Sequence, residues 1–204
     1  MRYCPFCRYH WNETRFCAHC GKDLSALVAS DDGYAPLDRY QWKPLPNGKY
    51  KLVSLNVLYD GPRANDLVIP DCVELIASFA FSDRRELTSL DLGDGVKTLE
   101  MGAFQNCMGL KRIRLGLGLQ VIGADAFSWC LGLERLTVPA CVKTVGDRAF
   151  DHCTGLRSLT VERGVEVIGS NAFRGCDSLR EITLPRGIRY ASDSFPAGAT
   201  LRFA

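Results

Sequence analysis

Large apolar residues recur at a fixed interval from about residue 64 to the end of the 204-residue chain. Three positions define the pattern, and each of them recurs every 23 residues. The repeated leucines are Leu87, Leu110, Leu133, Leu156 and Leu179, the phenylalanines are Phe81, Phe104, Phe127, Phe150 and Phe173, and the cysteines are Cys107, Cys130, Cys153 and Cys176. A period of about 20 to 30 residues is typical of a solenoid, in which each copy buries its apolar side against its neighbours.

Within each copy, alternation of apolar and polar residues predicts a half-buried strand. In the copy that opens at Leu133, the apolar Leu136 and Val138 alternate with polar neighbours at the period of two expected of a strand. Pro139 has no backbone donor and is expected to end the strand. A second, shorter apolar segment at 142–145 points inward again. The phenylalanine of each copy then fills the centre, and successive phenylalanines form an aromatic spine.

The two ends of the repeat region depart from this pattern. Residues 50–59 are rich in Val, Leu and Tyr, which predicts a strand that covers the first copy. In the last copy, Ala191 replaces a large apolar residue and Phe195 breaks the register. Leu201 and Phe203 are expected to form a terminal strand that closes the stack.

The first 24 residues carry a different signal, two Cys-x-x-Cys pairs formed by Cys4, Cys7, Cys17 and Cys20. Two such turns present four thiolates to one ion, and four soft ligands in a tetrahedron are what Zn²⁺ prefers. The segment has few apolar residues, so metal binding would supply most of its folding energy. The alternative is a redox pair, but that chemistry requires a helix N-terminus in a βαβ unit, and no such pattern surrounds these cysteines.

This segment resembles the short zinc-ribbon modules at the N-termini of many bacterial proteins. We therefore expect three parts: a zinc ribbon at 1–24, a linker at 25–48 that contains several Pro and Gly residues, and a repeat domain with its entry cap at 49–204.

The repeat region resembles the BspA-like, Treponema-type leucine-rich repeats through its Leu-x-x-Leu-x-Val-Pro, Val-x-x-Val-Gly-x-x-Ala-Phe and Cys elements. The resemblance implies a mixed, β-rich leucine-rich-repeat solenoid with a parallel sheet on one face. It also implies a role in binding or adhesion.

We interpret the repeated cysteines as buried, reduced and structural, because buried thiols are inert. His152 beside Cys153 suggests a catalytic pair, but Cys153 is expected to point inward.

Outward-facing residues of successive strands should line up in columns. One column reads Asp66, Ser89, Arg112, Arg135, Ser158 and Glu181, and the next reads Val68, Asp91, Arg114, Thr137, Thr160 and Thr183. Arg112, Arg114 and Arg135 form a basic cluster with Asp91 at its edge. Arginine is favoured at interfaces, so we expect a partner protein to bind here. The alternative is a solvated face with ordinary charges.

Charge and hydropathy limit the remaining function classes. The formal net charge of +2 at pH 7 argues against a dedicated nucleic-acid binder. No stretch approaches the roughly 18 apolar residues of a membrane span, and Cys4, Cys7 and His10 occupy the place of a signal peptide's apolar run. We expect a cytoplasmic bacterial interaction protein that is not an enzyme, has no small-molecule substrate and makes no membrane contact. The alternatives are a nucleic-acid-associated regulator that acts through the zinc ribbon and a surface adhesin.

Overall fold

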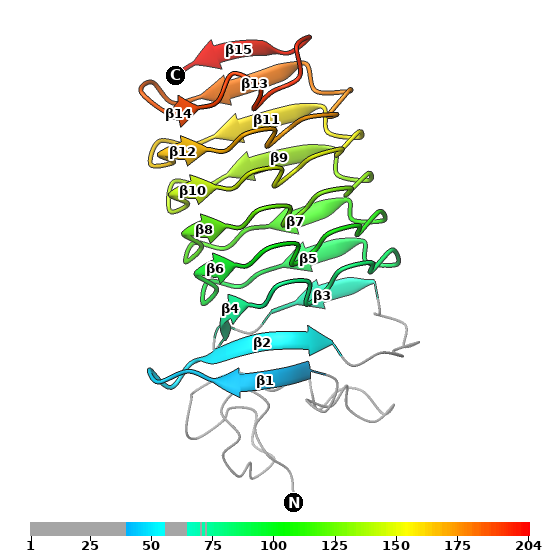
Figure 1. Ribbon diagram of the computed structural model, residues 1–204, viewed down its shortest axis with the longest axis vertical. Helices are drawn as coiled ribbons and strands as arrows, with labels where there is room; N and C mark the ends of the chain where they lie inside the picture. Colours follow the sequence, from blue (N-terminus) through cyan, green and yellow to red (C-terminus); the bar gives the residue numbers. More distant parts are fainter. Residues whose placement is uncertain (1–39, 56–64, 70, 72) are drawn as a thin grey trace, which may run out of the picture.

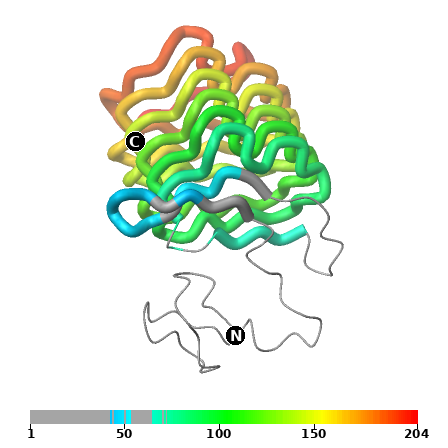
Figure 2. The backbone as a smooth tube through the Cα atoms, turned by 60° about the horizontal axis from the view of Figure 1, so that its bottom comes forward, coloured from blue at the N-terminus to red at the C-terminus, as the bar shows by residue number. Residues whose placement is uncertain are grey.

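The computed structural model describes residues 40–55, 65–69, 71 and 73–204. In these residues the chain forms fifteen strands and no helix, and its turns stack along one axis (Figures 1 and 2). The odd-strand face consists of β3 (Asp66–Val68), β5 (Ser89–Asp91), β7 (Arg112–Arg114), β9 (Arg135–Val138), β11 (Ser158–Val161), β13 (Glu181–Leu184) and β15 (Thr200–Phe203). The even-strand face consists of β2 (Tyr50–Leu55), β4 (Val73–Ile76), β6 (Thr98–Leu99), β8 (Val121–Ile122), β10 (Thr144–Val145), β12 (Val167–Ile168) and β14 (Arg189–Tyr190), with β1 (Tyr40–Pro44) beside β2.

Parallel strands line the odd-strand face as expected, and hydrogen-bonded parallel strands also line a second face, which was not expected. From β6 onward the second apolar segment of each copy forms a strand of two residues, and strands such as β8, β10 and β12 pair in parallel register. Thr144 lies opposite both Val121 and Val167. A two-residue strand is too short to show alternation in the sequence, which is why only the longer segment was predicted as a strand.

The entry cap begins earlier than predicted. β1 lies inside the segment assigned to the linker, and it pairs antiparallel with β2, with Tyr40 opposite Leu55. β2 then pairs in parallel with β4 and so starts the even-strand sheet. The predicted strand at 50–59 is present from Tyr50 to Leu55. The antiparallel hairpin gives β2 a partner on the side opposite β4.

The predicted aromatic spine runs through the centre of the stack. Consecutive rings are stacked from Phe81 through Phe195, with centroids 4.9, 5.4, 5.2, 5.2 and 5.6 Å apart. The five phenylalanines from Phe81 to Phe173 are almost fully buried. Each turn therefore contributes one ring to the core, and the ring packs against the equivalent ring of the turns before and after it.

The cysteine ladder is buried and makes one repeated contact. Each thiol donates a hydrogen bond to the carbonyl oxygen of the spine phenylalanine in the preceding turn. The Sγ···O distances are 3.2 Å for Cys107 to Phe81, 3.5 Å for Cys130 to Phe104, 3.2 Å for Cys153 to Phe127 and 3.2 Å for Cys176 to Phe150. Burial raises the pKa of Cys107 to about 12. The structural interpretation of these cysteines is confirmed, since all four thiols are buried and each donates a hydrogen bond to a carbonyl of the core.

The last turn keeps the spine by losing one residue. Tyr190, not Ala191, pairs with Ile168, so Ala191 takes the place that Gly123, Gly146 and Gly169 hold in the three turns before it. Phe195 then follows Phe173 by 22 residues and stacks on it. The expectation that Phe195 breaks the register is therefore wrong, because the deletion lies before it. β15 pairs with β13 as predicted.

Candidate protein-interaction face

The predicted outward columns of the odd-strand face are present. Ser89 lies opposite both Asp66 and Arg112, and Ser158 lies opposite both Arg135 and Glu181. The next column follows the same register, with Asp91 opposite Arg114 and Thr160 opposite Thr137. Between them, inward residues such as Leu90, Leu136 and Leu159 are buried. Strand alternation thus places the candidate residues on one surface.

Arg114 is held within an acidic cluster and does not act as a free cation. Its guanidinium lies 2.7 Å from Asp91 Oδ1 through Nη2 and 2.9 Å from Asp94 Oδ1 through Nη1. Hydrogen bonds to Asp91 and Asp94 raise its pKa. Sequence reasoning placed Asp91 beside the arginines but missed Asp94, which lies in the corner that follows β5. The two carboxylates compensate the charge of Arg114.

Arg112 and Arg135 are the more available cations of the predicted cluster. The side chain of Arg112 is 73% exposed, and its nearest ion-pair contact is a distance of 4.0 Å from Nη2 to Asp66 Oδ1. Arg135 is exposed and forms no ion pair with the residues that the structure describes. A long, exposed pair of this kind contributes little to stability. Both guanidinium groups can therefore bind an external carboxylate without breaking a strong internal contact.

The odd-strand face is interrupted between these two arginines. β7 ends a three-stranded sheet formed with β3 and β5, and β9 ends a four-stranded sheet formed with β11, β13 and β15 (Figure 1). The even-strand sheet runs without a break past the same turns, because β8 pairs with β10. Ile113, the inward residue of β7, is only partly buried, whereas Leu90 and Leu136 are buried. The face is therefore more open at β7 than in the strands on either side.

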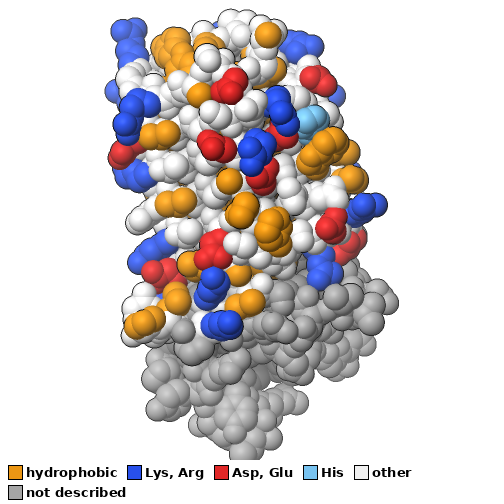
Figure 3. All heavy atoms as spheres, in the orientation of Figure 1, with side chains coloured by type: hydrophobic (Ala, Val, Ile, Leu, Met, Phe, Trp, Pro, Cys, Tyr) orange, Lys and Arg blue, Asp and Glu red, His pale blue; other side chains and the backbone are white. Residues whose placement is uncertain are grey.

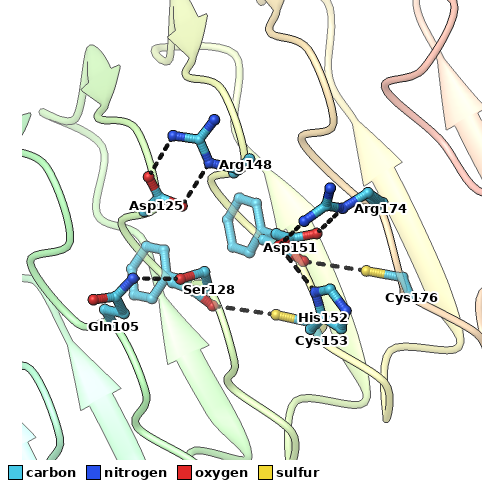
Figure 4. A network of polar contacts seen from close by, with 11 residues as sticks. Gln105, Asp125, Ser128, Arg148, Asp151, His152, Cys153, Arg174 and Cys176 are labelled. Atoms are coloured by element: carbon cyan, nitrogen blue, oxygen red, sulfur yellow. Dashed lines mark hydrogen bonds and ion pairs between the residues drawn. The ribbon is translucent and has the colours of Figure 1, made fainter.

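The turns on another side of the solenoid carry a polar network (Figure 4). Arg148 makes two hydrogen bonds to Asp125 (3.1 and 3.0 Å), and Arg174 makes two to Asp151 (3.0 and 3.0 Å). These contacts raise the pKa of both guanidinium groups. Each pair joins one turn to the next at the 23-residue interval. Charged side chains of both signs are interspersed over the viewed surface (Figure 3).

Trp129 is both exposed and packed against the neighbouring turn. Its side chain is 43% exposed, and its ring stacks on His152 with centroids 4.3 Å apart. Both residues have positive φ, at 61° and 55°, in a column of turn positions that ends in Gly175. The His152 ring covers Gly175, where a Cβ would come within 3.0 Å of His152 Cδ2.

His152 and Cys153 do not form a catalytic pair. The thiol of Cys153 points into the core toward Phe127, while the His152 ring lies on the surface against Trp129. His152 Nδ1 lies 2.9 Å from Asp151 Oδ2, yet the two atoms are not aligned for a hydrogen bond. Strand and turn geometry send these adjacent side chains in opposite directions, as expected from the position of Cys153 in the ladder.

The four predicted zinc ligands, Cys4, Cys7, Cys17 and Cys20, lie outside the described residues. Within the described ranges, no group of three or more His, Cys, Asp or Glu side chains is arranged to hold a metal ion. The same ranges contain no helix that is long and apolar enough to cross a membrane.

The family model of the BspA type leucine rich repeat region, with six copies, matches residues 54–128 and 74–199. The chain belongs to the BspA-type leucine-rich-repeat family. Proteins of this type are generally protein-interaction or surface proteins. No curated protein matches the chain.

Solved structures of leucine-rich-repeat proteins have the same fold. A leucine-rich cell surface protein from Faecalibacterium prausnitzii is 25% identical over 77% of this chain and 39% of its own, with a TM-score of 0.65. The pneumococcal vaccine antigen PcpA is 22% identical over 83% of this chain and 44% of its own, with a TM-score of 0.62. A leucine-rich-repeat protein from T. pallidum is 24% identical over 81% of this chain and 92% of its own, with a TM-score of 0.59. The chain thus spans less than half the length of the first and second of these proteins.

Proposed function

We propose that this BspA-type protein is a non-enzymatic interaction module that binds an acidic surface of a partner protein on its odd-strand face. Arg112 and Arg135 make the main contacts. The observation that carries the proposal is that these two exposed, weakly paired arginines flank the only interruption of the strand pairing on that face within the described residues.

The chemistry of the face supports this role. A guanidinium group offers a planar fork of donors that matches a carboxylate, and arginine is enriched at interfaces for that reason. Arg114 stays bound to Asp91 and Asp94 and so fixes the β5–β7 corner beside the contact.

A pull-down from the protein's own cell lysate tests the proposal. The bait is the full chain, and the test variant is Arg112→Ser with Arg135→Ser. Serine is chosen because Ser89 and Ser158 already occupy this column. We expect a specific partner with the wild type and at least about tenfold less of it with the double variant, since a charge-assisted contact at each arginine is lost.

Arg85→Ser with Arg157→Ser is the matched control, because it removes two exposed arginines that lie outside the odd strands. The control should recover the same partner in the same amount. Equal recovery by the wild type and the Arg112/Arg135 variant would contradict the proposal. Equal loss with both double variants would mean that net charge, and not this face, governs the capture.

We also propose that the N-terminal segment binds one Zn²⁺ through Cys4, Cys7, Cys17 and Cys20. The support is the spacing of the two Cys-x-x-Cys pairs in a segment with few apolar residues. The test is the zinc content of the purified full chain beside that of a chain lacking residues 1–24. One zinc ion per full chain and none in the shortened chain is the expected result. Zinc in neither protein would remove the proposal.

The cellular location separates two versions of the interaction role. We propose a cytoplasmic protein, whereas the similar F. prausnitzii protein is described as a cell surface protein and favours an adhesin. Immunodetection in cytoplasmic, cell-wall and culture-medium fractions distinguishes them. Recovery mainly in the cell wall or medium would favour the adhesin.

A further inference from the structure

The corner between the two faces in the last turns carries a basic groove. A cavity of about 650 Å³ opens there, and its charged lining consists of Lys143, Arg163, Arg186, Arg189 and Glu166. Four cationic side chains therefore face one acidic side chain, and Ala204 also lines the cavity. Apolar residues, including Val165 and Pro185, form part of the lining and are buried.

Three of the four cations in this groove have no partner among the residues that the structure describes. Lys143 Nζ lies 3.8 Å from Glu166 Oε1 and 3.3 Å from the carbonyl oxygen of Gly164. The exposed side chains of Arg163, Arg186 and Arg189 form no ion pair or hydrogen bond with the described residues. By contrast, the arginines of the turn network are each held by a carboxylate. The groove thus concentrates positive charge that the fold itself leaves uncompensated.

One arginine of the groove also lies on a strand that has a sheet partner on one side only, as far as the structure describes the chain. β14 is the last strand of the eight-stranded sheet, and it pairs only with β12 among the strands of the described chain. Arg189 opens this strand, and Tyr190 follows it with 40% of its side chain exposed. The N-terminal end of the same sheet differs, because the antiparallel β1 covers β2. An unpaired edge can accept an extended peptide as an additional strand.

We propose that this groove binds an acidic, extended peptide segment that adds to the free edge of β14. Carboxylates of the segment contact Arg163, Arg186 and Arg189, while its backbone pairs with residues 189–190. The sheet edge favours a peptide over a nucleic acid, because backbone donors and acceptors at strand spacing match another strand and do not match a phosphate chain. The site is separate from the Arg112–Arg135 face, so each proposal can fail without the other.

Fluorescence anisotropy with a defined peptide tests this site. The probe is a fluorescein-labelled peptide of about eight residues in which Glu alternates with Val, so that its acidic side chains lie on one side of a strand. The protein is the full chain, and the test variant replaces Arg163, Arg186 and Arg189 with Gln. We expect saturable binding to the wild type and a dissociation constant at least about tenfold higher for the triple variant.

Three comparisons make the result decisive. Replacing Arg85, Lys111 and Arg157 with Gln removes the same charge at exposed positions outside both proposed sites and should change the dissociation constant by less than about twofold. A peptide with N-methylated valines should bind more weakly, because it has lost backbone donors. Circular dichroism during heating checks that each variant is folded, and Arg186→Gln alone provides a milder change at an exposed position.

The opposite outcomes overturn the proposal. Equal weakening by the two triple variants would show that the peptide responds only to net charge. Equal affinity for the methylated and unmethylated peptides would exclude addition to the β14 edge. Tighter binding of a single-stranded oligonucleotide of equal charge would assign the groove to nucleic acid instead.

Discussion

The interior and the odd-strand face of the solenoid follow opposite rules, although both repeat every 23 residues. Inside, successive turns supply the same phenylalanine and leucine, four of them also supply the same cysteine, and the ring contact of one turn is made again in the next. Outside, the column at the first position of the odd strands reads Asp, Ser, Arg, Arg, Ser, Glu and Thr. Stacking constrains the interior, because a different side chain there disturbs the turns above and below. The outer column is free of that constraint and can serve recognition.

The largest expected effect is loss of a ring from the spine. Phe127→Ala should lower the free energy of unfolding by about 3 to 5 kcal/mol, because it removes a fully buried ring that contacts Phe104 and Phe150. Urea unfolding monitored by circular dichroism measures the change.

Trp129→Ala is the matched control for the spine, since Trp129 is aromatic but 43% exposed. Its loss should cost less than about 2 kcal/mol, mainly through the stack on His152. An equal effect of the two substitutions would mean that the spine is no more important than a surface ring.

The cysteine ladder should make stability fall at alkaline pH. Burial raises the pKa of Cys107 from 9.0 to about 12 and raises those of Cys130 and Cys153 well above 9.0. Above pH 9 the unfolded chain loses thiol protons that the folded chain keeps, so the unfolded state gains stability as pH rises. Each such thiol should lower the free energy of unfolding by about 1.4 kcal/mol per pH unit above pH 9, up to its folded pKa.

Urea unfolding of the wild type and Cys153→Ala at pH 8, 9 and 10, under reducing conditions, isolates the contribution of one thiol. Cys153→Ala should show the shallower decline with pH, because other titrating groups act equally in both proteins. Parallel declines would contradict the predicted role of the buried thiol.

The turn network should show a smaller, graded effect. Asp151 and Asp125 each bind an arginine of the following turn through two hydrogen bonds, but the Asp151 side chain is 6% exposed and that of Asp125 is 17% exposed. Asp151→Asn should therefore lower the unfolding midpoint in urea more than Asp125→Asn, because its charge-assisted bonds are better shielded from water. The reverse order would show that burial does not set the strength of these contacts.

The sequence predicted the interior better than the surface for a physical reason. Phe127 and Cys153 recur in a fixed register, and burial by stacking follows directly from the repeat. Arg114 could not be assigned correctly, because its partner Asp94 lies in a corner whose path the repeat does not specify. The two-residue even strands were missed because alternation needs more residues to be visible. The groove at Arg163 and Arg186 gave no signal, since its residues become neighbours only when two corners stack.

The smallest expected effect concerns the interruption between β7 and β9. Arg112 and Arg135 occupy consecutive places in one column, and like charges on neighbouring strands destabilise their pairing. Arg135→Ser restores the residue type found at Ser158 and should raise the free energy of unfolding by about 0.2 to 1 kcal/mol at low salt. The gain should shrink as salt is added, because exposed charges are screened.

Thr137→Ser is the control, because it lies on the same strand and leaves the charges unchanged. It should show no salt-dependent gain. If Arg135→Ser is neutral or destabilising at low salt, charge repulsion is not the cause of the interruption. If Arg135→Ser is stabilising, this face holds two arginines that repel each other, and a partner's carboxylate would relieve that repulsion. This property distinguishes a recognition surface from the uniform interior beneath it.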